Sequence, residues 1–115
     1  MAVEDQVARI ARTEALFRDV NERVAEAAER FDSDEAEFVC ECADPACTER
    51  VEAPLDDYER VRANGTHFLL VPGHEDTRVE RVVGARRRYA IVEKFERRIA
   101  GLVRRMDPRG AAAGS

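Results

Sequence analysis

Three cysteines within eight residues constrain the fold and the chemistry of this chain more than any other feature of its sequence. Cys40, Cys42 and Cys47 form a C-x-C-x4-C pattern. The first two are alternate residues at the end of an expected strand, so their side chains point to one side. Asp44-Pro45 favours a tight turn that returns the third thiol toward them. Because zinc prefers thiolate and imidazole ligands in a closed tetrahedral shell, the pattern predicts a structural zinc site on a zinc-knuckle-like loop.

The fourth ligand of such a site has to come from one of the two histidines of the chain. His74 follows Pro72-Gly73 at the end of an expected strand, where its side chain can reach a neighbouring loop. His67 stands at the start of an apolar strand, where we expect it to pack or to face solvent. We therefore predict a zinc site formed by the three cysteines and His74, with His67 as the reserve ligand.

Two other interpretations of the cysteines stay open. The thiols can be reduced and partly buried side chains that hold no metal. They can also form a thiol redox switch through a Cys42–Cys47 or a Cys40–Cys47 disulfide. The odd number of cysteines, and an N-terminus without the basic and apolar segments of a secretory signal, predict a cytoplasmic protein with reduced thiols. That setting favours metal binding.

The length of 115 residues is typical of one domain with a modest core. No apolar run approaches the roughly 18 to 20 residues that cross a bilayer, so we expect no membrane segment. We predict a single α+β domain over residues 1–108. Residues 109–115 are small or polar, and we expect a disordered tail there.

Residues 1–31 are predicted to form one long helix, because the segment lacks Gly and Pro and is rich in Ala, Glu and Arg. Apolar residues recur along one face at helical spacing. They are Val3, Ile10, Phe17, Val24 and Phe31, with Val7, Val20, Ala27 and Ala28 beside them. This face fits either the domain's own sheet or a homodimer formed through residues 3–31, with Glu14 and Asn21 as interruptions.

Residues 37–94 are predicted to form a small antiparallel sheet with the cysteine knuckle at one end. Strands are expected at residues 37–41, from residue 51 and at residues 66–71, with a short helix between Pro54 and Asn64-Gly65. Residues 79–94 fit a helix or a hairpin, and we favour the hairpin because Gly84 interrupts the segment and Ile91-Val92 is β-branched. An amphipathic C-terminal helix is expected at residues 95–106.

Charge is divided unevenly along the chain. Residues 1–77 hold 8 basic and 20 acidic residues, whereas residues 78–115 hold 11 basic and 4 acidic residues. The two parts can attract each other within one molecule or across a dimer. The alternative is a regulator that binds nucleic acid through basic side chains. Those side chains would be Arg86, Arg87, Arg88, Arg97 and Arg98.

Catalytic motifs are missing from the sequence. It contains no nucleophile elbow, no phosphate-binding loop and no Gly-rich cofactor turn. Cysteine-based chemistry would need Cys47 paired with His74 and an oxyanion site. We therefore predict that the chain is not an enzyme and is a zinc-stabilised interaction or regulatory protein.

Several segments resemble a group of short bacterial proteins that share the C-x-C-x4-C block and a later Pro-Gly-His-Glu turn. The segments are residues 12–23, 38–50, 58–62, 71–75 and 79–83. The resemblance covers most of residues 12–94 and departs from the group at residues 84–88, where such proteins tend to carry an acidic or polar turn. Because the group has no established activity, the resemblance supports the cysteine and Pro-Gly-His elements and implies no reaction.

Overall fold

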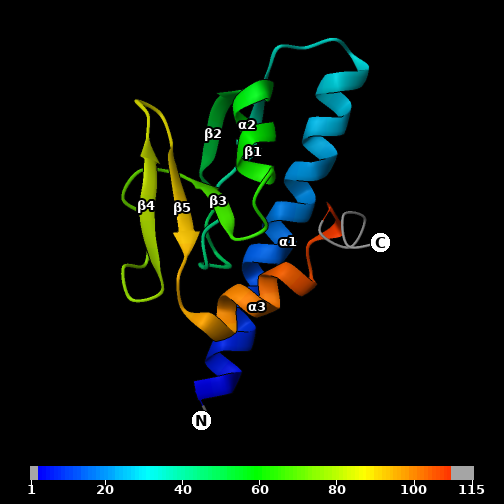
Figure 1. Cartoon of the computed structure of the whole chain (residues 1–115). Helices are drawn as coiled ribbons and strands as arrows, with labels where there is room; N and C mark the ends of the chain where they lie inside the picture. The colour runs from blue at the N-terminus through cyan, green and yellow to red at the C-terminus, as the bar shows by residue number, and fades with distance from the viewer. Residues whose placement is uncertain (1–2, 110–115) are drawn as a thin grey trace.

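The structure, a computed structural model, describes residues 3–109 and shows one long helix beside two small sheets (Figure 1). The elements are α1 (Val3–Arg30), β1 (Glu35–Val39), β2 (Arg50–Pro54), α2 (Leu55–Arg62), β3 (His67–Leu70), β4 (Glu80–Ala85), β5 (Ala90–Lys94) and α3 (Arg97–Arg105). The predicted α+β class is confirmed, with its long N-terminal, short middle and C-terminal helices. Of the predicted tail at residues 109–115, all but the first residue lie outside the described part of the chain.

Two antiparallel sheets are present where the sequence predicted one. β1 pairs with β2, and the other sheet has the order β3-β5-β4. The favoured hairpin at residues 79–94 is confirmed as β4 and β5, whose register shifts between Val82 and Gly84. Just beyond β1, the Glu41 N–H donates to the Leu69 carbonyl at 2.8 Å. This contact joins the two sheets next to the cysteines.

α1 packs against different elements along its length. α3 crosses its N-terminal half, and β1 and α2 lie beside its C-terminal half (Figure 1). One apolar cluster includes Cys40 and Cys42 together with residues of α1, α3, β3 and β5. A second cluster lies between β1, β2 and α2, where the rings of Phe38 and Tyr58 stack with centroids 4.4 Å apart. The end of β1 therefore carries the cysteines into the first cluster.

The buried face of α1 differs from the predicted apolar stripe. Glu14, Arg18 and Asn21 are fully buried, whereas Phe31 at the end of the stripe is 78% exposed. Polar side chains can lie on the core side because they find partners there, as Arg18 does by donating to two backbone carbonyls at 2.8 and 2.6 Å. Within the stripe, Val7 and Ala28 are buried, and the partly exposed members are Ile10, Phe17, Val20, Val24 and Ala27.

One ammonium group and two carboxylates meet in the interior between α1 and the larger sheet. Lys94 of β5 forms ion pairs with Glu14 of α1 and with Glu80 of β4, and all three side chains are almost fully buried. Burial raises the pKa of Glu14 to about 7, although the charge of Lys94 opposes the rise. In the folded chain, Glu14 therefore titrates near neutral pH.

The raised pKa of Glu14 predicts that the free energy of unfolding depends on pH. Glu14 binds its proton more tightly in the folded chain than in the unfolded chain, where its pKa is near 4.5. The stabilisation from protonation is therefore complete below pH 4.5 and is lost as the pH rises to about 7. We expect Glu14→Gln to remove this slope, at most about 1.4 kcal/mol per pH unit, in urea denaturation at a series of pH values. Parallel curves for variant and wild type would contradict the assignment.

Candidate metal centre

Two connecting loops bring together the four side chains that the sequence predicts as metal ligands. Cys40 follows β1, Cys42 and Cys47 lie in the connection to β2, and His74 lies in the loop after β3. Their three sulfurs and one imidazole nitrogen all lie within 4.8 Å of one another. Within residues 3–109, this is the one convergent group of three or more such residues.

Two of the distances between ligand atoms match the edges of a tetrahedral zinc shell. His74 Nδ1 lies 3.6 Å from the Cys40 sulfur and 3.7 Å from the Cys47 sulfur. Zinc at about 2.3 Å from sulfur and about 2.0 Å from nitrogen gives a tetrahedral S···N edge of about 3.6 Å. The four residues thus form a group that could hold a metal ion, and three sulfurs with one imidazole are donors that suit zinc.

Hydrogen bonds hold the cysteine loop in shape. The Val71 N–H donates to the Cys40 sulfur at 3.2 Å. In the turn, the Asp44 side chain accepts from the Ala46 N–H at 2.9 Å, and the Asp44 carbonyl accepts from the Cys47 N–H at 3.0 Å. A short acidic side chain that bonds to the backbone two residues on is typical of a tight turn. The turn returns Cys47 to the other two cysteines.

A second tight turn positions His74. Gly73 has a φ of +94°, in the left-handed region that favours glycine. The His74 N–H donates to the Val71 carbonyl at 3.0 Å, which closes the turn. Val71 therefore contacts the site twice, because its N–H bonds the Cys40 sulfur and its carbonyl bonds the His74 backbone.

Burial raises the pKa of both the Cys40 and the Cys42 thiols. Backbone hydrogen bonds, from Val71 to Cys40 and from Asp44 to Cys42, oppose the rise. Because zinc binds the thiolate, a metal entering this group has to displace protons from the sulfurs. The affinity for metal is therefore expected to fall as the pH falls.

The reserve ligand, His67, lies apart from the cysteines. Its Nε2 is 3.3 Å from an oxygen of Glu93, the residue opposite it on β5. This cross-strand pair holds the His67 ring on the sheet. Of the two histidines, only His74 joins the convergent group.

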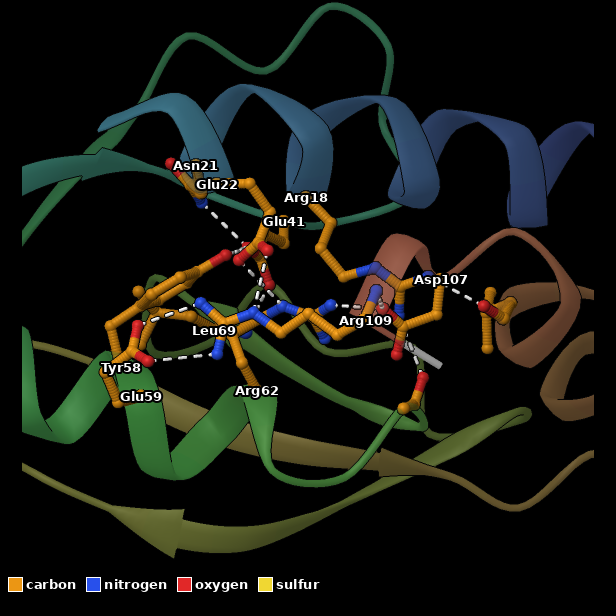
Figure 2. Close-up of polar contacts among 12 residues, drawn as sticks. Arg18, Asn21, Glu22, Glu41, Tyr58, Glu59, Arg62, Leu69, Asp107 and Arg109 are labelled. Carbon is orange, nitrogen blue, oxygen red and sulfur yellow. Dashed lines mark hydrogen bonds and ion pairs between the residues drawn. The ribbon is translucent and has the colours of Figure 1, made fainter. Parts of the chain in front are cut away.

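Between the first two cysteines, the buried Glu41 connects the site to three other elements (Figure 2). Its Oε2 accepts from Asn21 Nδ2 of α1 at 2.8 Å and from the Tyr58 hydroxyl of α2 at 3.1 Å. Its Oε1 accepts from the Leu69 N–H of β3 at 2.9 Å. Burial raises the pKa of this carboxyl, and the bonds from Asn21 and Leu69 oppose the rise. Sequence reasoning missed Glu41, although the interruption of the α1 stripe at Asn21 is a signal of a buried polar partner.

Asn21 also fixes the strand end that carries the first cysteine. Its Nδ2 donates to the Val39 carbonyl, and its Oδ1 accepts from the Val39 N–H, both at 2.8 Å. The side-chain amide thus bonds the last residue of β1 as a neighbouring strand would. Asn21 and Glu41 together hold the Cys40–Cys42 segment against α1 (Figure 2).

A row of ion pairs extends from this region toward the C-terminal end (Figure 2). Arg62, whose side chain is fully buried, pairs with Glu22 at 3.1 Å and with Asp107. Arg109 pairs with Glu22 at 2.7 Å and with Glu59 at 2.8 Å. These pairs join α1, α2 and the end of the described chain. The first residue of the predicted tail, Arg109, is therefore held in place.

A surface hollow of about 360 Å³ adjoins the cysteine group. It is lined by Cys42, Ala43, Asp44, His74, Asp76 and Glu80. Two of the four candidate ligands therefore face a space that opens to solvent. Small ions and reagents can reach the site through this hollow.

The arginines predicted to bind nucleic acid form two separate groups. Residues 86–88 lie in the turn between β4 and β5, and residues 97–98 lie at the start of α3, beyond the other end of β5 (Figure 1). Arg88 pairs with Glu52 at 2.9 Å, and Arg98 pairs with Glu96 at 3.1 Å. The five arginines therefore lie beyond opposite ends of β5.

Two further findings bear on the class of this protein. In the part of the chain that the structure describes, no helix has both the length and the apolar character needed to cross a bilayer. No family model, no curated protein and no solved structure matches the chain, so its candidate metal centre is defined by its own four residues.

Proposed function

We propose that this chain is a non-catalytic, zinc-stabilised interaction or regulatory protein of a reducing compartment such as the cytoplasm. The observation that carries the proposal is the convergence of Cys40, Cys42, Cys47 and His74 within 4.8 Å. Four protein ligands complete the tetrahedral shell of zinc and leave no position for a substrate. A closed shell of this kind supports folding.

A zinc ion in this group would connect parts of the chain that are distant in sequence. Three ligands belong to the connection between β1 and β2, and His74 belongs to the loop after β3, 27 residues beyond Cys47. Near the cysteines, the two small sheets are otherwise joined by hydrogen bonds of Cys40 and Glu41 with Val71 and Leu69. Metal binding therefore contributes folding free energy by holding the two loops together.

Metal content of the purified full-length chain tests the proposal. We expect one zinc per chain by native mass spectrometry after purification under reducing conditions without added metal. Cys42→Ser and His74→Ala are each expected to lose most of it, because three ligands bind zinc much less tightly than four. His67→Ala is the matched control and is expected to keep one zinc per chain. Wild-type protein that carries no zinc would overturn the proposal.

The partner that we propose is a second copy of the chain, bound through α1. Leu16, Val20 and Phe31 are 61%, 38% and 78% exposed, and Phe17 and Val24 are partly exposed beside them. The row repeats at positions 17, 20, 24 and 31, which is the a and d spacing of a helical seam. A contiguous exposed apolar row of this kind marks an interaction surface.

Self-association can be measured directly by sedimentation equilibrium. We expect the wild type to dimerise and Val20→Arg to weaken the dimer at least about tenfold, or about 1.4 kcal/mol, because the charge enters the centre of the apolar row. Glu26→Gln, on the opposite exposed side of α1, is expected to leave the dimer unchanged. A wild type that stays monomeric at a chain concentration of about 100 μM, at which even a weak dimer would form, would contradict this partner.

A further inference from the structure

We infer that the candidate metal centre is also a peroxide-sensitive modification site, in which Cys42 and Cys47 form a disulfide and release the zinc while Cys40 stays reduced. The inference rests on the proposed zinc site and adds the chemistry that regulates it. It depends on an asymmetry among the three cysteines in their hydrogen bonds, their access to the surface and the length of chain that separates them.

Cys40 is the most protected of the three thiols. It is 1% exposed and belongs to an apolar cluster with Phe68 and Leu70. Its sulfur also accepts the Val71 N–H at 3.2 Å. A reagent has to displace core side chains to reach this sulfur, and moving the sulfur would leave the Val71 N–H without its partner.

Cys42 is buried, at 3% exposed, but it borders the surface hollow, and Cys47 is the most exposed of the three cysteines. Cys42 lines the 360 Å³ surface hollow, and Cys47 is partly exposed in the loop that follows. Their sulfurs lie within 4.8 Å of each other, as do all ligand atoms of the group. A peroxide that enters the hollow therefore meets Cys42 before Cys40, and one that approaches the loop from solvent meets Cys47.

A change in the turn between Cys42 and Cys47 can bring their two sulfurs to the distance of a disulfide bond. A disulfide bond is about 2.05 Å long, so the two sulfurs have to approach each other. Of the four residues that separate them, Asp44, Pro45 and Ala46 are exposed. Cys40 and Cys42 are alternate residues, and a disulfide between them would close a much smaller and more strained ring. The exposed turn thus favours the Cys42–Cys47 pair.

The oxidation balances with one peroxide per disulfide. Zinc-bound cysteines are thiolates, and the Cys47 thiolate attacks a peroxide oxygen, which forms an S–O bond and breaks the O–O bond. The Cys42 thiolate then attacks the Cys47 sulfur, which forms the S–S bond and expels hydroxide. Two electrons pass from the thiolates to the peroxide, which leaves as two hydroxides, and acid from the buffer protonates these to water. Only Cys40 and His74 remain as ligands, and two ligands do not retain zinc.

The test uses the zinc-loaded full-length chain, treated with hydrogen peroxide and then digested after glutamate. Cleavage at Glu37, Glu41 and Glu49 separates Cys40 from the peptide that holds Cys42 and Cys47. We expect one zinc released for each disulfide, with the disulfide inside the residue 42–49 peptide and Cys40 free to react with an alkylating reagent. In metal-free chains, Cys40→Ser is expected to form the same disulfide, and Cys47→Ser is expected to form less than a tenth as much.

The other outcomes separate this inference from the proposed function. Zinc that is present at the start and stays bound at peroxide concentrations that oxidise free cysteine would overturn the inference and leave the zinc site intact. A disulfide that joins Cys40 to the residue 42–49 peptide would overturn the inference as well. A wild type without zinc before treatment would overturn the proposed function and, with it, the release of zinc.

Discussion

Removal of zinc is expected to lower the stability of the folded chain by about 4 kcal/mol, the contribution of a ligand present at about a thousand times its dissociation constant. For a chain of this size, that loss corresponds to a fall in melting temperature of about 15 °C or more. The effect is large because the two loops that carry the four ligands lose the proposed zinc ion that both of them bind. The apolar clusters around Phe68 and Tyr58 stay intact, so a folded but weakened chain should remain.

Differential scanning calorimetry with and without a strong chelator measures this effect. The matched variant is Cys40→Ser, which lacks one ligand and is expected to melt at a low temperature whether or not the chelator is present. Wild type and chelated wild type that melt at the same temperature would show that no metal stabilises the fold. Saturating zinc added back to the chelated wild type is expected to restore the original melting temperature.

Substitution of Glu41 by alanine is expected to cost about 3 to 5 kcal/mol, the range observed when one partner of a buried charged contact is removed. The Asn21 amide, the Tyr58 hydroxyl and the Leu69 N–H would each lose their acceptor. Each unpaired buried donor is destabilising by about 1 to 3 kcal/mol, so the total is among the largest for any single site. Urea denaturation at pH 7 measures the change.

The matched control for Glu41 is Glu37→Ala, on β1 just before the cysteine segment. Glu37 is exposed and pairs with the exposed Arg50 at 3.4 Å, so its loss is expected to change the free energy of unfolding by less than about 1 kcal/mol. Equal effects of the two substitutions would contradict the role of Glu41 as the connection between the cysteine segment, α1, α2 and β3.

The order of helices and strands could be predicted because it depends on local signals. The first 31 residues lack helix breakers, Gly84 interrupts the segment that becomes β4 and β5, and Asp107-Pro108 ends α3. The division into two sheets could not be predicted. It depends on which strands pair over a distance, and the spacing of apolar residues does not encode that choice.

The four residues of the candidate site were predictable for a similar reason. Structural zinc sites are built mainly from cysteine and histidine, and a Pro-Gly turn allows His74 to point away from its strand. The choice between His74 and His67 became clear only in the structure, where Glu93 lies opposite His67 and contacts its ring.

The buried polar residues of α1 were the least predictable feature. Glu14 and Asn21 interrupt the predicted apolar stripe, and the sequence did not single out Arg18, yet all three are fully buried. Their partners, such as Lys94 for Glu14 and Glu41 for Asn21, come from segments far away in the sequence. The periodicity of a helix considers only the polarity of each side chain by itself. The free energy of burying a charge depends on the partner that the charge meets in the fold.

Zinc K-edge X-ray absorption of the protein as purified tests the proposed metal centre most directly, because it counts the atoms bound to the metal. The proposed site predicts three sulfur neighbours at about 2.3 Å and one nitrogen neighbour at about 2.0 Å. Loss of the nitrogen shell in His74→Ala measured with zinc added back would identify the imidazole. A shell of oxygen and nitrogen atoms without sulfur, or a sample that contains no zinc, would contradict the assignment of Cys40, Cys42, Cys47 and His74 as a structural zinc site.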